Sequence, residues 1–259
     1  MARYSWSDHY AVLRHALGAV ARRLGEDGWR AVVLVDDNRL VDREAAYRAG
    51  LGWYGKNANL LLPGQGSWFV LGSVVTDAAL PPTGPPVEDG CGPCTRCLTA
   101  CPTGAIVAPG VVDARRCLAW LLEAPGSFPV EHRTALGDRI YGCDDCQEVC
   151  PPNRLGERSQ PPPRPADDDE PWIDLVELLE LPDDLLMARV GRWYVPRRQP
   201  RYVRRNALVA LGNVGDGQDP AVERVVRAAL ASDDPLLREH AAWAAERLGR
   251  DDLLPERAP

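Results

Sequence analysis

The amino-acid sequence predicts an α+β protein made of three parts, each indicated by a different residue pattern. Residues 1–80 combine an amphipathic helical pattern with short apolar runs, which predicts a partial α/β domain. Residues 81–155 contain all eight cysteines of the chain, and residues 172–259 carry only helical patterns. Between the last two parts, residues 156–171 are rich in proline and acidic side chains and predict an exposed linker.

Composition narrows the class of protein. The chain has 259 residues, of which 45% are hydrophobic, and its net charge is −7. A globally acidic chain is not expected to coat nucleic acid non-specifically, although it can hold a local basic surface. The polar start lacks the apolar segment of a signal peptide, and no apolar run approaches the ~18–20 residues that a membrane helix needs. We therefore expect a cytoplasmic protein with no membrane segment.

The N-terminal part is expected to begin with a helix over residues 8–24. Apolar residues recur there at spacings of three and four and form one stripe, made of Tyr10, Leu13, Leu17, Val20 and Leu24. The β-branched run 31–35 then predicts a buried strand, directly followed by Asp36. Asp42 is expected to cap a short helix that Gly50 terminates.

A glycine-rich loop at residues 50–57 follows this helix. It nearly matches a phosphate-binding P-loop, but Asn57 stands where Ser or Thr is required, and the expected helix precedes the loop instead of following it. We therefore exclude nucleoside triphosphate binding, although glycines of this kind let a backbone approach a flat cofactor closely. The next two apolar runs, 58–62 and 68–75, are predicted to form a hairpin joined by residues 63–66.

Asp36 has two interpretations. It stands at the end of a predicted strand, where α/β proteins place side chains that face a ligand. Alternatively, Asp36 or Asp37 only starts a turn, as an aspartate often does, and the pattern alone favours this second interpretation.

The cysteines form two similar runs. The first, Cys91-x2-Cys94-x2-Cys97-x3-Cys101-Pro102, has the spacing of bacterial two-cluster ferredoxins. The second repeats this spacing with its first cysteine displaced upstream, as Cys117 and then Cys143-x2-Cys146-x3-Cys150-Pro151. Three thiolates two residues apart can wrap one cubane, while the fourth, which precedes a proline, reaches the other cubane.

This spacing predicts two [4Fe–4S] clusters with crossed ligands and a ferredoxin-like domain over residues 81–155. Cluster one takes Cys91, Cys94, Cys97 and Cys150, and cluster two takes Cys101, Cys117, Cys143 and Cys146. Two tetrahedral zinc sites are the alternative, but zinc sites rarely use a run of this kind and have no need to repeat it. A disulfide framework is expected of small secreted proteins rather than of a chain of this size.

The C-terminal part contains a faint internal repeat. The segment from Val203 to Ala210 matches the segment from Leu237 to Ala244 at an offset of 34 residues. Asp-Pro pairs at 219–220 and 234–235 predict helix starts, because proline is favoured in the first turn. A HEAT-like repeat of helical hairpins fits this pattern, and an ordinary helical bundle is the alternative.

The sequence resembles a known family over residues 1 to about 155. The residues that carry the resemblance are Val35-Asp36, Ala49-Gly-Leu-Gly-Trp-Tyr-Gly-Lys-Asn57, Ser67, Leu71-Gly72, Gly90 to Ile106 around the first cysteine run, Asp113-Ala-Arg-Arg-Cys117 and Arg139 to Gln147. This combination of paired clusters and a Gly-Leu-Gly-Trp loop is similar to that of the epoxyqueuosine reductases, many of which end in a helical repeat domain.

The resemblance implies a function. The family reduces epoxyqueuosine to queuosine at the wobble position of tRNA, using cobalamin and two [4Fe–4S] clusters that deliver single electrons. It makes the N-terminal part a cobalamin-binding domain, and it makes Asp36 the proton donor to the departing epoxide oxygen, which leaves poorly without a proton. Cofactor contacts are then expected from Gly52, Trp53, Lys56, Asn57 and Ser67.

Two departures from the family pattern are visible. Family members usually carry a further N-terminal segment before the part that corresponds to Ala2, and that segment supplies part of the cobalamin pocket. The residues Asp37-Asn-Arg-Leu40 also replace the small segment that usually follows the aspartate, so that Arg39 is expected to narrow or recharge the pocket.

A basic run at residues 192–205 is the expected tRNA contact. It holds six arginines and three aromatic residues in fourteen positions and no acidic residue. Arginine binds phosphate in a bidentate manner, and aromatic rings stack on bases. The arginines are Arg192, Arg197, Arg198, Arg201, Arg204 and Arg205. The alternative is a solvated helix face that pairs with the acidic residues 167–170.

The main prediction is therefore an oxidoreductase that acts on tRNA, receives electrons from an external low-potential donor, and works as a cytoplasmic monomer. One alternative is a two-cluster electron-transfer protein without cobalamin. Another is a related cobalamin reductase with a substrate other than tRNA.

Overall fold

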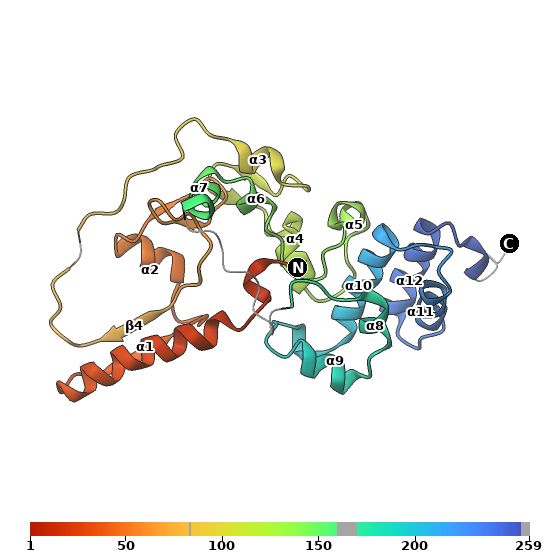
Figure 1. Ribbon diagram of the computed structural model, residues 1–259, viewed down its shortest axis with the longest axis horizontal. Helices are drawn as coiled ribbons and strands as arrows, with labels where there is room; N and C mark the ends of the chain where they lie inside the picture. The colour runs from red at the N-terminus through yellow and green to blue at the C-terminus, as the bar shows by residue number, and fades with distance from the viewer. Residues whose placement is uncertain (83, 160–169, 255–259) are drawn as a thin grey trace. The chain divides into compact units, whose positions relative to one another are not determined.

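The computed structural model describes residues 1–82, 84–159 and 170–254 (Figure 1). The chain divides into two compact units. Unit 1 comprises Met1–Ser5, Ala114–Cys143 and Glu170–Pro259, and unit 2 comprises Trp6–Asp113 and Asp144–Asp169. The cysteine-rich segment 81–155 is thus shared between the two units, and its predicted boundaries differ from the boundaries of these units.

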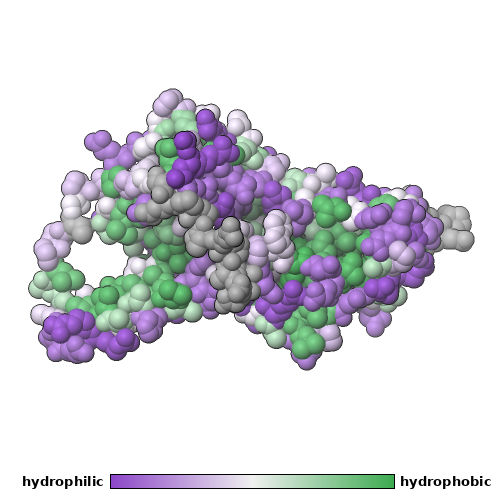
Figure 2. Space-filling model, in the orientation of Figure 1, coloured by the Kyte–Doolittle hydropathy of each residue, from purple (hydrophilic) through white to green (hydrophobic). Residues whose placement is uncertain are grey.

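Unit 2 begins with the helix that the sequence predicts. Helix α1 (His9–Glu26) starts at Asp8, whose carboxylate accepts a hydrogen bond from the Ala11 N–H. Its apolar stripe packs so closely on the chain before β4 that a Cβ on Gly72 would come within 2.7 Å of Leu17. No residue of α1 is buried, however, and Val12 is 73% exposed. Figure 2 shows hydrophobic residues gathered on the surface of this part of unit 2.

The strands of unit 2 pair differently from the prediction. Strand β1 (Ala31–Leu34) pairs antiparallel with β4 (Ser73–Thr76), and β2 (Trp53–Tyr54) pairs antiparallel with β3 (Leu60–Leu61). The predicted hairpin between 58–62 and 68–75 is therefore wrong, because each of these segments pairs with an earlier strand. The prediction that β1 is buried is also only partly right, since Val32 in its middle is 49% exposed.

Helix α2 (Asp42–Arg48) lies where it was expected but is capped differently. The capping position is Val41, which makes no side-chain hydrogen bond, so the prediction that Asp42 caps the helix is wrong. Gly50 follows the helix with φ +70°, a left-handed conformation that glycine adopts at little cost, and its predicted role as terminator is confirmed.

Short elements complete unit 2. They are α3 (Arg96–Ala100), β5 (Ile106–Ala108), β6 (Val111–Val112), α6 (Asp145–Glu148) and α7 (Pro151–Ser159). Helix α3 packs against α6, which brings together the parts of the two cysteine runs that belong to unit 2. Because α7 extends to Ser159, the prediction of a linker that begins at residue 156 is wrong. Residues 160–169 of that linker, with most of its acidic run, lie outside the described residues.

The described part of unit 1 is helical, as predicted for the C-terminal part. Its elements are η1 (Arg3–Ser5), η2 (Ala114–Arg116), α4 (Leu118–Glu123), α5 (Val130–Leu136), α8 (Leu175–Glu180), α9 (Asp183–Arg189), η3 (Pro196–Arg198), α10 (Arg201–Val214), α11 (Pro220–Leu230), α12 (Pro235–Arg247) and η4 (Asp251–Leu253). The caps of α11 and α12 are Asp219 and Asp234, each accepting a hydrogen bond from a backbone N–H two residues later, so both predicted helix starts are confirmed. Within 170–254 no strand is present.

Helix α10 is the centre of unit 1. Ten of its fourteen residues are buried, and it packs against α12, α8, α5 and α4. The repeat at an offset of 34 residues relates α10 to α12, which lie directly against each other. HEAT-like character remains a prediction.

A buried polar network joins α5 to α12. The Arg133 guanidinium, 3% exposed, forms an ion pair with Glu239 and donates to the Phe128 carbonyl at 3.0 Å. The His240 ring is fully buried, and its Nε2 accepts the Phe128 N–H at 3.1 Å. Burial is the main reason why the pKa of His240 is lowered to about 4, and the positive charge of Arg133 acts in the same direction.

Candidate functional site

The eight cysteines form no disulfide. Within the described residues, no three His, Cys, Asp or Glu side chains converge as ligands of a metal ion do. The four cysteines of a cubane each bind a different iron atom, so they are spaced more widely than the ligands of a single ion.

The four cysteines predicted for cluster one belong to unit 2. Cys91 and Cys94 lie in a turn closed by a hydrogen bond from the Cys94 N–H to the Cys91 carbonyl, at 3.1 Å, and Cys97 lies in α3. Cys150 directly precedes α7 and is buried. The pKa of its thiol is raised to about 11, first by burial and further by the negative charge of Cys91, Cys97 and Cys94. The structure thus brings these four thiols into one electrostatic neighbourhood.

Lys56 fixes the loop that carries the first cysteines. Its Nζ donates to the carbonyl of Gly92 at 2.6 Å and to the carbonyl of Cys94 at 2.9 Å. Both of these hydrogen bonds go to backbone carbonyls of the cysteine loop.

A second set of hydrogen bonds fixes the segment around Cys150. Asn153 is 1% exposed; its Oδ1 accepts the Ser67 N–H at 2.5 Å, and its Nδ2 donates to the Gln147 carbonyl at 2.8 Å. The Ser67 hydroxyl also donates to Gln147 Oε1 at 2.8 Å. Sequence reasoning did not identify Asn153 as part of the site, and only its place three residues after Cys150 could have drawn attention to it.

The remaining predicted cofactor contacts lie beside these residues. Asn57 is 6% exposed and donates from Nδ2 to the Cys146 carbonyl at 3.4 Å. A Cβ on Gly52 would come within 2.1 Å of the Leu61 carbonyl oxygen, so the glycine lets β2 approach β3. Trp53 is 7% exposed and belongs to the same buried cluster as Cys150. The structure therefore places Trp53, Lys56, Asn57 and Ser67 beside the cysteine segments, whereas Gly52 lies against β3.

The four cysteines predicted for cluster two are divided between the units. Cys101 and Cys146 belong to unit 2, and Cys117 and Cys143 belong to unit 1. Cys101 ends α3; burial raises the pKa of its thiol, but hydrogen bonds from Ala105 and Thr103 outweigh burial and lower it overall. Cys117 is the capping residue of α4. The assignment of cluster two remains a prediction.

Asp36 lies two residues beyond Leu34, the last residue of β1, and is exposed. Its φ is +52°, a left-handed conformation that costs a non-glycine residue free energy and that is concentrated at functional sites. Its neighbour Asp37 forms an ion pair with Arg39 at 2.7 Å, and the hydrogen bonds from Arg39 lower the pKa of Asp37 to about 2. The charge of Arg39 is thus paired with that of Asp37, two residues earlier in the chain.

Asp36 also acts on a further carboxyl group. The pKa of Asp42 is raised, first by burial and then by the negative charges of Asp36 and Asp37.

The basic run 192–205 is only partly a surface. Arg205 is 1% exposed, and it donates to the carbonyls of Leu121, Leu122, Ala124 and Gly126 at the C-terminal end of α4. Its prediction as a tRNA contact is therefore wrong, because a guanidinium that satisfies helix-end carbonyls in the core cannot meet a phosphate. Burial also lowers the pKa of Arg205 to about 10.

The other arginines of the run differ in their partners. Arg192 donates to the Ser5 carbonyl at 2.8 Å, and Arg198 donates to the Gly191 carbonyl at 3.0 Å. Arg197 is exposed and left-handed, with φ +51°. Of the three aromatic residues only Tyr194 is exposed, at 64%, since Trp193 and Tyr202 are buried.

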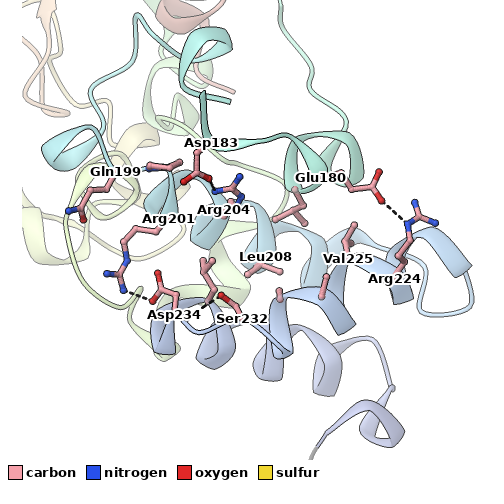
Figure 3. A pocket seen from close by; sticks show the side chains of 15 residues that line it. Glu180, Asp183, Gln199, Arg201, Arg204, Leu208, Arg224, Val225, Ser232 and Asp234 are labelled. Atoms are coloured by element: carbon pink, nitrogen blue, oxygen red, sulfur yellow. Dashed lines mark hydrogen bonds and ion pairs between the residues drawn. The ribbon is translucent and has the colours of Figure 1, made fainter. Parts of the chain in front are cut away.

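Arg201 and Arg204 line a cavity of about 730 Å³ between α8, α10, α11 and α12. Figure 3 shows three arginine–carboxylate pairs around it. They are Arg201–Asp234 at 2.5 Å, Arg204–Asp183 at 2.5 Å and Arg224–Glu180 at 2.7 Å. Each arginine of the cavity wall is therefore paired with a carboxylate, and all three carboxylates lie outside the run 192–205.

Comparison with known proteins completes the description of the site. Residues 90–153 match the family model of the 4Fe-4S double cluster binding domain. The chain is 37% identical over 261 residues to an epoxyqueuosine reductase of Vibrio cholerae, covering 98% of this chain and 69% of the relative.

Two solved structures are similar to this chain. One is an epoxyqueuosine reductase with a tyrosine tRNA stem loop modified with epoxyqueuosine, at a TM-score of 0.84 and 34% identity over 95% of this chain and 66% of that chain. The other is the Bacillus subtilis epoxyqueuosine reductase with its catalytic aspartate loop swung out of the active site. Its TM-score is 0.84 and its sequence identity 34%, over 96% of this chain and 66% of that chain. This chain therefore spans about two thirds of the length of these relatives.

The cysteine motif and the matched domain define an iron–sulfur protein of the double [4Fe–4S] cluster class. The zinc alternative is thereby set aside. At this level of identity and coverage, the chain belongs to the epoxyqueuosine reductase family.

Among the described residues, no helix combines the length and the apolar character needed to cross a bilayer.

Proposed function

We propose that this chain acts in the reduction of epoxyqueuosine to queuosine at the wobble position of tRNA. The observation that carries the proposal is the set of four thiols in unit 2, at ferredoxin spacing, around the buried Cys150. The family relatives named above support the substrate, since one solved relative contains an epoxyqueuosine-modified tRNA stem loop.

The residues of unit 2 fit a cubane at cluster one. Thiolates are the ligands that [4Fe–4S] clusters require, and iron replaces the protons that the clustered thiols otherwise retain. When bound, the clusters supply single electrons. The hydrogen bonds of Lys56 and Asn153 hold the two cysteine segments in position, as outer contacts do around other metal sites.

Cobalamin is the second cofactor in the proposal, and its support is the family resemblance. Lys56, Asn57 and Ser67 form hydrogen bonds within the protein, and Gly52 is closed off by the Leu61 carbonyl, so these residues do not present an open donor set. Adding cobalamin to anaerobic protein and following its absorbance after gel filtration tests this part of the proposal, and co-elution is the expected result.

Asp36 is the proposed proton donor. It lies in a left-handed turn after β1, and the loop that bears it is the part of this chain that we relate to the aspartate-bearing catalytic loop of the Bacillus subtilis relative. An epoxide oxygen needs a proton as it leaves, which a carboxyl group can donate. Asp36→Asn is expected to abolish queuosine formation from an epoxyqueuosine-modified stem loop. Asp27→Asn, which changes an exposed carboxylate at the end of α1, is the matched control. Full activity of Asp36→Asn would remove Asp36 from the mechanism.

The proposed tRNA contact is narrower than the whole basic run. Arg197 and Tyr194 are exposed in the segment between α9 and α10, and they combine a phosphate-binding cation with a ring that can stack. Arg192 and Arg198 are exposed there too, but their guanidinium groups donate to backbone carbonyls of Ser5 and Gly191. Arg197→Glu is expected to weaken stem-loop binding and to reduce its salt dependence by about one phosphate contact. Arg227→Glu on α11 is the control. Equal affinities of the two variants at fixed salt would contradict this contact.

The wider proposal rests on the sequence and on the family resemblance. It describes a cytoplasmic monomer with a HEAT-like C-terminal part that receives electrons from an external low-potential donor. Anaerobic reconstitution with iron and sulfide, followed by turnover of a modified stem loop with a chemical reductant and cobalamin, tests the reductase activity directly. Protein that binds both clusters but leaves the epoxide intact would favour an electron-transfer protein instead.

A further inference from the structure

The indole N–H of Trp53 is buried without an acceptor. Trp53 is 7% exposed, and its Nε1 has no hydrogen-bond partner in the part of the chain that the structure describes. Buried polar groups in native proteins almost always have a partner, so an exception needs an explanation. Tryptophan is a donor only, and the missing partner must therefore be an acceptor.

Trp53 lies in the same buried cluster as two of the predicted ligands of cluster one. Trp53, Leu61 and Cys150 form one buried cluster, against which Cys91 packs. A Cβ on Gly90 would come within 2.7 Å of Trp53 Cζ2 and within 3.0 Å of Cε2, the carbon that bears Nε1. The edge of the indole is thus held against the peptide that leads into Cys91.

The position of the indole is set by the backbone. Trp53 pairs with Leu61 in the short sheet of β2 and β3, and this pairing is possible because Gly52 has no Cβ to meet the Leu61 carbonyl. A ring held from both sides in this way loses little further freedom when it forms a hydrogen bond.

We propose that the Trp53 N–H donates a hydrogen bond to a sulfur of cluster one and raises the reduction potential of that cluster. The acceptor is a cysteinate or sulfide sulfur, which this position places among Cys91, Cys150 and the cubane that they hold. A donor stabilises the reduced cluster more than the oxidised one, because reduction adds negative charge to the sulfurs. Trp53 is thus a positioning and tuning residue, and its role depends on the cluster ligation proposed above.

Redox titration of the full, anaerobically reconstituted chain tests the proposal. In Trp53→Phe, the equilibrium constant for reducing one cluster is expected to fall about tenfold, because a hydrogen bond to a charged acceptor contributes a free energy of about that size. A tenfold fall lowers the reduction potential of a one-electron couple by about 59 mV. The other cluster is expected to keep its potential. Trp29→Phe, which changes a tryptophan of unit 2 that is 43% exposed, is the matched control.

A spectroscopic measurement identifies the bond itself. With indole-¹⁵N-labelled tryptophan, electron–nuclear double resonance of the reduced protein is expected to show a ¹⁵N and an exchangeable-proton coupling that Trp53→Phe loses and Trp29→Phe keeps. If the smaller ring of Phe disturbs cluster loading, benzothienylalanine at position 53 keeps the shape of the side chain and removes only the N–H.

The outcomes separate this inference from the proposed function. Protein loaded with iron and sulfide, with unchanged potentials and no ¹⁵N coupling, would overturn the role of Trp53 and leave the clusters in place. Protein that never acquires iron and sulfide would overturn the ligation and this inference together.

Discussion

Replacement of Gly66 by alanine tests the polar network behind Cys150. Gly66 has φ +81°, and a Cβ there would lie 1.9 Å from Asn153 Oδ1 and 2.8 Å from the Asn153 backbone N. Gly64 in the same turn has φ +74°, and a Cβ there would meet nothing within 4 Å. The two glycines share the same backbone strain and differ in the clash, so they form a matched pair.

The magnitudes follow from this difference. Left-handed strain costs an alanine about 1 kcal/mol, so Gly64→Ala is expected to lower the free energy of unfolding by about that amount. In Gly66→Ala the Asn153 side chain must also leave, which strands the buried Ser67 N–H and the Gln147 carbonyl. Each of the two stranded groups adds about 1–3 kcal/mol, for a total loss of roughly 3–7 kcal/mol.

Urea unfolding of both variants, followed by tryptophan fluorescence under anaerobic conditions, measures the two losses. Iron content provides a second measurement, because Asn153 lies three residues after Cys150 and its displacement is expected to loosen cluster one. Equal destabilisation of the two variants, with equal iron content, would show that the network does not support this segment.

Three further predictions concern single side chains. Arg205→Met is expected to lower the free energy of unfolding by about 3 kcal/mol or more, because the carbonyls at the end of α4 lose their donor, whereas Arg227→Met, on a side chain that is 58% exposed, should cost under about 0.5 kcal/mol. Equal losses in urea would contradict the burial argument. The lowered pKa of His240, about 4, means that the unfolded chain binds the proton more tightly, so stability is full above pH about 6.5 and falls by about 3 kcal/mol as the pH drops towards 4. His240→Leu should flatten this part of the pH profile of the urea midpoint, and an unchanged slope would count against it. Lys56→Met removes two hydrogen bonds to carbonyls of the cysteine loop and is expected to speed iron loss to a chelator about tenfold, whereas loss at the wild-type rate would mean that Lys56 does not hold the loop.

Local signals in the sequence were sufficient for several elements. Helix α1 was predicted from its apolar spacing, and α11 and α12 from their Asp-Pro starts. These features depend on side chains within one or two helical turns, so no knowledge of distant residues is needed.

Strand pairing was beyond such signals. Segment 58–62 resembles one arm of a hairpin, but β3 pairs back to β2 and β4 pairs back to β1. Alternation along a strand identifies its faces but not its partner, which is chosen by packing between distant segments.

The basic run shows the same limit for charge. Arg197 and Arg205 are both arginines of the same run, yet Arg197 is exposed and Arg205 is only 1% exposed. The sequence of a charged run does not show which of its side chains will face solvent and which will face the core. The packing of α10 against α4 decides this, and the buried Arg205 guanidinium then donates to helix-end carbonyls about eighty residues away in the chain.

The sequence by itself predicted which thiolates bind iron, because three cysteines at C-x2-C-x2-C spacing can wrap one cubane through local geometry and the fourth, before a proline, reaches the other. Only the tertiary structure decided what holds those thiolates: Lys56 on the first cysteine loop, Asn153 behind Cys150, and Trp53 with its unpaired N–H beside them. The physical reason is that a buried polar group must find a partner, and that partner becomes available only when segments far apart in the chain pack together.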